Sequence, residues 1–251
     1  MKVGSKVLCF GLMLACMTAS AMADESFDAK VHAYLVAHPE VLIEMSAVLQ
    51  QRQQAAAAGR ADAAIKANHA ALFADKTDPV TGNRDGDLTI VEFFDFQCPF
   101  CKAEAPSLAR LVAEDGHIRM VYKQYPVIGG PGSMTAAKAA LAAVKQHKYR
   151  AFHEALMKDK TREGELSEKK ILDAAKSAGL DVEKLRHDMA APEVAAKVGA
   201  DLALGRAIGI SGTPALIIGD HLVAGAVPYP ELTQLIAQAR AGEPAPAPAH
   251  R

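Results

Sequence analysis

The chain has 251 residues, 50% of them hydrophobic, which is enough for one large domain or for a domain with an appendage. Its formal net charge of −1 at pH 7 gives no electrostatic basis for binding nucleic acid. Once the N-terminal segment described next is removed, no apolar run is long enough and suitably placed to span a membrane. We therefore expect a globular protein without a nucleic-acid partner.

The N-terminus has the three parts of a signal peptide. Lys2 and Lys6 supply a positive region, residues 7–17 are apolar, and Ala21-Met22-Ala23 is a cleavage site of the A-x-A type. A buried N-terminal helix is the alternative, but the complete three-part pattern favours a signal. We predict that residues 1–23 are removed and that the protein is exported to the periplasm.

The cysteine inventory depends on that cleavage. Cys9 and Cys16 leave with the signal, so the mature chain keeps only Cys98 and Cys101. Cleavage before Cys16 would instead give a lipoprotein attached to the outer membrane or the surface, but Met13 stands where Leu is usual. One closely spaced pair is no disulfide framework, and a bridge over so short a loop restrains little of the unfolded chain. The pair is better suited to chemistry than to stabilisation.

The first part of the mature chain reads as helical. The pattern predicts a helix over 27–58 with a break at His38-Pro39, because proline suits the first turn of a new helix. Leu42, Met45 and Leu49 follow the spacing of a narrow apolar stripe. The stripe fits a coiled-coil seam between copies of the chain and packing on the chain's own body equally well.

The next part reads as the start of an α/β domain. Residues 75–87 are rich in turn formers, and we place the domain boundary just before them. Residues 88–96 are apolar at nearly every position, as in a strand buried on both faces. A helix over 102–114 and a second strand over 118–125 follow. This order predicts a right-handed crossover with parallel pairing of the two strands.

The rest of the chain alternates helices with short strands. A long helical block is expected over about 133–209. Residues 215–218 and 221–224 are two short strands joined by a tight turn, and a closing helix covers 230–240. Residues 242–251 contain three prolines and are predicted to be a disordered tail.

Cys98-Pro99-Phe100-Cys101 lies where the first strand gives way to the helix, which is typical of a thiol redox site. Pro99 suits the first helical position, and the free N–H groups of that helix end favour a thiolate. We expect Cys98 to be the exposed nucleophile and Cys101, one turn inside, the resolving thiol. A structural disulfide or half of a metal site is the alternative. Zinc would need two further ligands, so no metal and no cofactor are expected.

Four further residues are candidates for the site. Thr213-Pro214 precedes the third strand, and a cis peptide bond there would face the cysteines and expose the Thr213 backbone to an extended substrate. Glu92 lies in the first strand, and burial would let it take up protons during thiol chemistry, whereas an edge position would make it a surface carboxylate. Lys123 in the second strand is its expected partner.

The segment from Glu92 to Cys101 resembles the active-site strand and motif of the DsbA-like branch of the thioredoxin superfamily, and Thr213-Pro214 is similar to its cis-proline loop. The resemblance implies a thioredoxin-like α/β fold over 75–241, with the block at 133–209 as an inserted helical domain. Residues 24–74 are then an N-terminal helical segment.

Residues 28–42 and 124–129 resemble the suppressor-of-copper-sensitivity ScsC proteins and the related Com1-type group. In some members the N-terminal segment forms a trimer, which implies a homotrimer through residues 27–60 here, whereas other members are monomers. Trimeric members act as isomerases, and monomeric ones behave more like oxidants. Phe100 departs from the pattern, because Tyr or His is more usual at that position.

The sequence therefore predicts a periplasmic thiol–disulfide oxidoreductase or isomerase. It would act on the cysteines of exported proteins through Cys98 and Cys101, with a redox partner in the membrane. The alternative is a copper-binding or surface protein that uses the same fold without redox turnover, with both thiolates as soft ligands.

Overall fold

The computed structural model describes residues 27–242. The predicted signal peptide and the tail from residue 243 onward lie outside the described residues. The described residues divide into two compact units, residues 27–55 and residues 56–242, and each is described by itself.

Residues 27–37 are helical, the helix is interrupted at His38-Pro39, and α2 begins at Glu40 in the first unit and ends at Ala67 in the second. The predicted break is confirmed, because proline has no N–H to continue the first helix. Leu42, Met45 and Leu49, the predicted stripe, are exposed.

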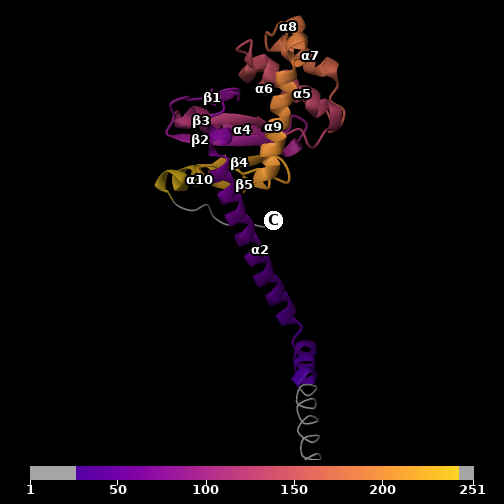
Figure 1. Ribbon diagram of the computed structural model, residues 1–251, viewed down its shortest axis with the longest axis vertical. Helices are drawn as coiled ribbons and strands as arrows, with labels where there is room; N and C mark the ends of the chain where they lie inside the picture. Colours follow the sequence, from indigo (N-terminus) through magenta and orange to yellow (C-terminus); the bar gives the residue numbers. More distant parts are fainter. Residues whose placement is uncertain (1–26, 243–251) are drawn as a thin grey trace, which may run out of the picture. The chain divides into compact units, whose positions relative to one another are not determined.

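A mixed sheet with strand order β1-β3-β2-β4-β5 forms the centre of the second unit (Figure 1). The strands are β1 (Val80–Gly82), β2 (Leu88–Phe94), β3 (Ile118–Gln124), β4 (Ala215–Ile218) and β5 (His221–Ala224). The parallel pairing predicted for β2 and β3 is confirmed, and all other pairs are antiparallel. Strand β1 was not predicted, because its three residues lie within a segment dominated by turn formers.

Helix α4 (Pro99–Asp115) connects β2 to β3 and confirms the predicted crossover. The expected helical block consists of five helices: α5 (Gly130–Val144), α6 (Tyr149–Met157), α7 (Glu168–Ser177), α8 (Val182–Met189) and α9 (Pro192–Ile208). The short helix α3 (His69–Phe73) precedes the sheet, and α10 (Tyr229–Ala241) follows it. Among residues 27–242, no helix combines the length and the apolar composition that crossing a lipid bilayer requires.

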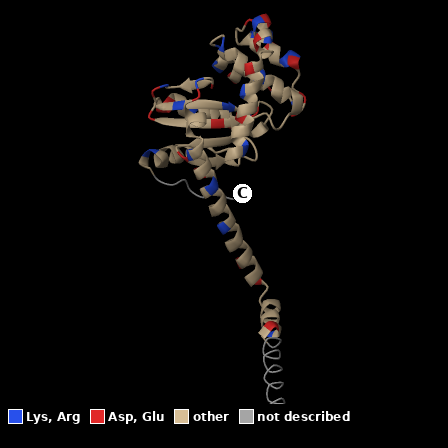
Figure 2. Ribbon diagram, viewed as in Figure 1, with Lys and Arg blue, Asp and Glu red and all other residues tan. Residues whose placement is uncertain are grey.

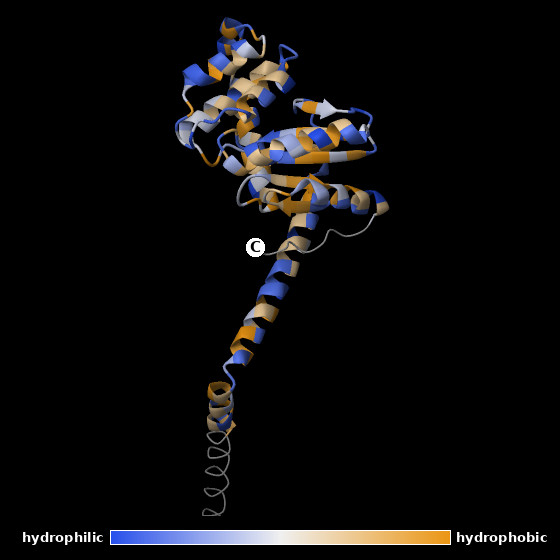
Figure 3. Ribbon diagram, turned by 180° about the vertical axis from the view of Figure 1, so that it is seen from behind, coloured by the Kyte–Doolittle hydropathy of each residue, from blue (hydrophilic) through white to orange (hydrophobic). Residues whose placement is uncertain are grey.

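The sheet is covered on both faces, and its strands are largely hydrophobic (Figure 3). On one face, Ile90 packs with residues of α4 and α10, including Leu108 and Leu232. On the other face, Phe93 packs with Ile65 and with residues of α3 and α9. Successive side chains of β2 therefore enter two different cores, which explains its nearly continuous apolar sequence.

The second of these faces also holds a buried group of charges. Lys123 of β3 forms an ion pair with Asp78, and its Nζ lies 3.9 Å from Asp201 Oδ1. Lys197 of α9 lies 2.5 Å from Asp78 Oδ1 and 2.6 Å from Asp201 Oδ1. Two cations and two carboxylates thus compensate one another and connect β3 and α9 to the segment before β1.

We predict that Lys123→Met lowers the free energy of unfolding by about 3 kcal/mol, because it leaves buried carboxylates with one cation fewer. The matched control is Lys169→Met, which removes an exposed pair with Asp173 and should cost less than about 1 kcal/mol. Urea unfolding measures both values. Equal losses for the two variants would show that the buried group is not a major source of stability.

Candidate dithiol site at the start of α4

The two cysteines lie at the N-terminal end of α4, as predicted. Cys98 is the N-cap residue with extended backbone, and Pro99 occupies the first turn, where a missing N–H does no harm. Phe100 is 64% exposed. The expected exposure of Cys98 is wrong, because only 1% of its surface is accessible, and Cys101 is fully buried at 0%.

The loop before β4 lies against Cys98. The peptide bond between Thr213 and Pro214 is cis, which confirms the prediction for this pair. In its protonated form the Cys98 thiol donates to the carbonyl oxygen of Thr213, with Sγ and O 3.2 Å apart. The same loop is connected to the end of β5, because Gly225 N–H donates to the carbonyl oxygen of Pro214. The predicted contact between two segments far apart in sequence is therefore present.

The two thiols differ in pKa. A hydrogen bond with the Cys101 side chain lowers the pKa of Cys98 to about 6, and the backbone N–H groups of Phe100 and Cys101 act in the same direction against the effect of burial. Burial raises the pKa of Cys101 well above the ordinary thiol value. At neutral pH the site therefore holds a thiolate at Cys98 beside a thiol at Cys101, which is the arrangement of a nucleophile with a resolving partner.

The residues just before Cys98 form a polar network that the sequence did not reveal. The carboxylate of Asp95 accepts hydrogen bonds from the N–H groups of Gln97 (2.9 Å) and Ile128 (2.8 Å) and from the Ser133 hydroxyl (2.5 Å). Cys98 N–H donates to the backbone carbonyl oxygen of Asp95 at 3.0 Å. The network fixes the junction between β2 and α4. Polar residues at the end of an apolar strand were its only sequence signal.

Glu92 is buried, as predicted, and faces the helix that carries the cysteines. Burial raises its pKa well above the ordinary value, and the nearby charges of Glu104 and Cys98 act in the same direction.

The predicted pairing of Glu92 with Lys123 is wrong. In the parallel pair β2–β3, Glu92 stands opposite Tyr122, whereas Lys123 stands opposite Phe93. Because side chains alternate between the two faces of a sheet, Lys123 lies on the far face, where it pairs with Asp78.

Glu104 is a second buried carboxyl that the sequence reasoning missed. Its Oε1 accepts the Val227 N–H at 2.7 Å, whereas its Oε2 has no hydrogen-bond partner among the described residues. Burial raises the pKa of Glu104 to about 7, against the effect of the Val227 hydrogen bond. It follows Cys101 by three residues on the buried face of α4, and that spacing is the signal that could have identified it.

No group of three or more His, Cys, Asp or Glu side chains with the arrangement of a metal site occurs between residues 27 and 242.

Comparison with protein families agrees with this geometry. A family profile described as Thioredoxin matches residues 74–238. The chain belongs to the thioredoxin family. A second profile, described as the copper resistance protein ScsC N-terminal domain, matches residues 25–56.

Three solved structures are similar to this thioredoxin-family chain. A thioredoxin-like oxidoreductase from Silicibacter pomeroyi is 42% identical, with a TM-score of 0.66 over 69% of this chain and 98% of that one. ScsC of Proteus mirabilis in a transitional conformation is 30% identical, with a TM-score of 0.65 over 88% and 99% of the two chains. The thiol-disulfide exchange protein α-DsbA2 from Wolbachia pipientis is 31% identical, with a TM-score of 0.65 over 71% and 95%.

The two family profiles and these structures identify a DsbA-like protein of the ScsC type, with the fold that the sequence implied. Among curated relatives, the chain spans about a quarter of the length of the Na⁺/H⁺ antiporter NhaA 1 of Salinispora arenicola, which is 29% identical over 66% of this chain.

We predict that Cys101→Ala raises the pKa of Cys98 from about 6 toward the ordinary value of a thiol, because the largest stabilising hydrogen bond to the thiolate is lost. Thiolate absorbance of the reduced protein against pH measures this shift. Cys98→Ala is the control, since it should remove the titration near pH 6. An unchanged midpoint in Cys101→Ala would contradict the assignment of Cys101 as the main stabilising partner.

Proposed function

We propose that the protein is a thiol–disulfide oxidoreductase that acts on the cysteines of exported proteins. The observation that carries the proposal is the pairing of a thiolate at Cys98 with a buried thiol at Cys101, beneath the cis-proline loop. The similarity to a thioredoxin-like oxidoreductase and to a thiol-disulfide exchange protein supports the same chemistry.

The reaction has two exchange steps. The Cys98 thiolate attacks one sulfur of a substrate disulfide, forms a mixed disulfide and releases the other substrate sulfur as a thiolate. Cys101 then loses its proton and attacks Cys98 Sγ, which forms the Cys98–Cys101 disulfide and releases the second substrate thiolate. Two electrons pass from the protein to the substrate. The reverse sequence transfers two electrons from a substrate dithiol to the protein.

The buried carboxyls have a role in the proton balance of the second step. Cys101 cannot attack until it loses a proton, and burial holds the proton on its sulfur. Glu92 and Glu104 lie near the dithiol, and both have raised pKa values. Either group in its ionised form can accept that proton. Neither Lys123 nor any other residue of the buried charge group on the far face takes part.

Substrate binding uses the loop before β4. An extended peptide that approaches Cys98 meets the backbone of Thr213, which lies within hydrogen-bond distance of the sulfur. Strand-like pairing with this backbone would hold a substrate cysteine next to Cys98 without selecting its neighbours. The exposed ring of Phe100 adds an apolar contact at the same place.

The N-terminal segment determines which reaction is favoured. We assign residues 27–60 to a homotrimer, supported by the exposed apolar side chains of Leu42, Met45 and Leu49 and by the match of residues 25–56 to the ScsC N-terminal domain. Several dithiols in one assembly favour isomerisation, because a misfolded substrate can be attacked at more than one disulfide. The compartment is the periplasm, and a redox partner in the membrane resets the dithiol.

The direct test of the chemistry is reduction of insulin disulfides by dithiothreitol. Wild-type protein should accelerate insulin precipitation, and Cys98→Ala should be no faster than dithiothreitol alone, because the attacking sulfur is missing. Ala103→Ser, an exposed substitution on the same helix, is the matched control and should keep wild-type activity. Equal rates for wild type and Cys98→Ala would overturn the proposal.

Solution mass tests the assembly. We expect a trimer for the chain that begins at Asp24 and a monomer after deletion of residues 24–60, because the deletion removes the exposed apolar stripe. Light scattering coupled to size exclusion measures both. The double substitution Leu42→Ser with Leu49→Ser should also give monomers. A monomeric full chain would contradict both the trimer and the preference for isomerisation, while leaving the dithiol chemistry intact.

A further inference from the structure

A cavity of about 340 Å³ lies between α4 and α6, on the face of the sheet that carries Glu92. Its size falls within the range of small-molecule sites. Ala109 and Val112 of α4 and Met157 at the end of α6 contribute apolar walls. The lining groups all come from residues 81–158, so the cavity belongs entirely to the second unit.

The inner end of the cavity holds two buried polar groups without partners. Glu92 Oε1 and His153 Nε2 both line the cavity, and neither has a hydrogen-bond partner among the described residues. Burial raises the pKa of the Glu92 carboxyl well above its ordinary value, and it lowers the pKa of His153 to about 3, so the imidazole is neutral. An unsatisfied buried polar group is costly, which makes this end of the cavity a site for a ligand with its own donors and acceptors.

The rim of the cavity is positively charged. Lys102, Arg150 and Lys158 line it, against a single carboxylate, Glu154. Lys102 Nζ donates to the carbonyl oxygen of Asp159 at 2.8 Å and lies 4.0 Å from its carboxylate, and Arg150 is paired with Glu154 at 2.9 Å. Lys158 is exposed, and its side-chain ammonium has no ion pair or hydrogen bond within residues 27–242. The ammonium group of Lys158 is therefore an uncompensated positive charge next to apolar walls, which suits a negatively charged organic molecule.

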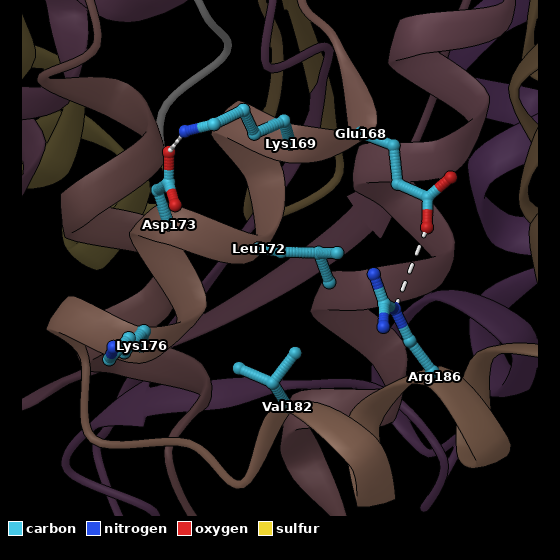
Figure 4. A pocket seen from close by; sticks show the side chains of 7 residues that line it. All are labelled: Glu168, Lys169, Leu172, Asp173, Lys176, Val182 and Arg186. Carbon is cyan, nitrogen blue, oxygen red and sulfur yellow. Dashed lines mark hydrogen bonds and ion pairs between the residues drawn. The ribbon is translucent and has the colours of Figure 1, made fainter.

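A second hollow lies between α7 and α8, and it differs in its charge pairing and in its buried polar atoms (Figure 4). Four of its five charged residues pair with one another, Lys169 with Asp173 at 2.7 Å and Arg186 with Glu168 at 3.8 Å. Acidic and basic residues alternate along these two helices (Figure 2). That hollow contains no buried polar atom without a partner in the described residues, and it carries no proposal.

We infer that the cavity between α4 and α6 binds a small organic anion with an apolar body, whose inner end contacts Glu92 and His153 and whose charge lies at the basic rim. The site is separate from the surface that meets a substrate disulfide. Ligand binding in this cavity needs no thiol chemistry, so the inference can be tested independently of the proposed function. Glu92 lines the cavity and also lies near the dithiol. A ligand in the cavity would therefore contact a carboxyl that lies beside the two cysteines.

The test uses 2-naphthoate as the probe and the isotope-labelled chain that begins at Asp24. Proton–nitrogen NMR spectra locate binding by residue, so they separate this cavity from the exposed apolar stripe of the N-terminal segment. We expect saturable shifts confined to α4, α6 and their neighbours, with a dissociation constant of about 1 mM or lower. Neutral 2-naphthamide should bind about threefold more weakly, because it cannot pair with the rim.

Two substitutions of exposed alanines give the matched comparison. Ala109→Trp fills the cavity from its wall and should abolish the shifts, whereas Ala196→Trp on α9 adds the same side chain outside the cavity and should leave them unchanged. Unchanged far-UV circular dichroism shows that both variants fold. Absence of saturable shifts at about 10 mM, or binding that survives Ala109→Trp, would overturn the site. Equal affinity for the acid and the amide would overturn the preference for an anion.

Discussion

The buried carboxylate of Asp95 is the constraint on which the geometry of the dithiol depends. It accepts hydrogen bonds from three groups that belong to the strand end, to the segment before α5 and to α5 itself. Gln97 extends the connection, because its side-chain amide donates to the carbonyl oxygen of Gly129 and accepts the N–H of Leu166. A buried charge is tolerated only when such partners are complete. The thioredoxin core and the inserted helices are therefore joined immediately before Cys98. Gly129 shows how close this packing is, because a Cβ there would overlap the Gln97 side chain.

In the described part of the chain, buried ionisable groups form ion pairs on one face of the sheet and lack them on the other. On the face toward α9, Lys123 and Lys197 pair with two aspartates, and their positive charges oppose the effect of burial, which raises the pKa of both carboxyls. On the face toward α4, no cation within residues 27–242 pairs with Glu92, and burial raises the pKa of its carboxyl well above the ordinary value. Glu92 and Lys123 belong to neighbouring pairs of the β2–β3 register, one residue apart, so their side chains lie on opposite faces of the sheet. These ion pairs are thus confined to one face of the sheet, and the carboxyl of Glu92 lies on the other.

The sequence predicted what depends on local pattern. The bounds of β4 and β5, the start of α4 at Pro99 and the parallel pairing of β2 with β3 follow from apolar runs, turn formers and helix-capping chemistry. The partner of Lys123 could not be predicted, because strand register decides which side chains share a face. The burial of Cys98 was missed for a related reason, since the loop that covers it comes from more than a hundred residues later. The Asp95 network and the role of Glu104 likewise depend on contacts between distant segments.

The lowered pKa of Cys98 also sets an energy difference between the two oxidation states. At pH 7 a thiol with a pKa of about 6 is ionised in a ratio of about ten to one, which stabilises the reduced protein by about 1.4 kcal/mol relative to an ordinary thiol. The disulfide form gains nothing from these hydrogen bonds, because it has no thiolate. For a two-electron couple the difference corresponds to about 30 mV. The hydrogen bond between two cysteine side chains thus makes the disulfide of this site a stronger electron acceptor than the same bridge would be without it.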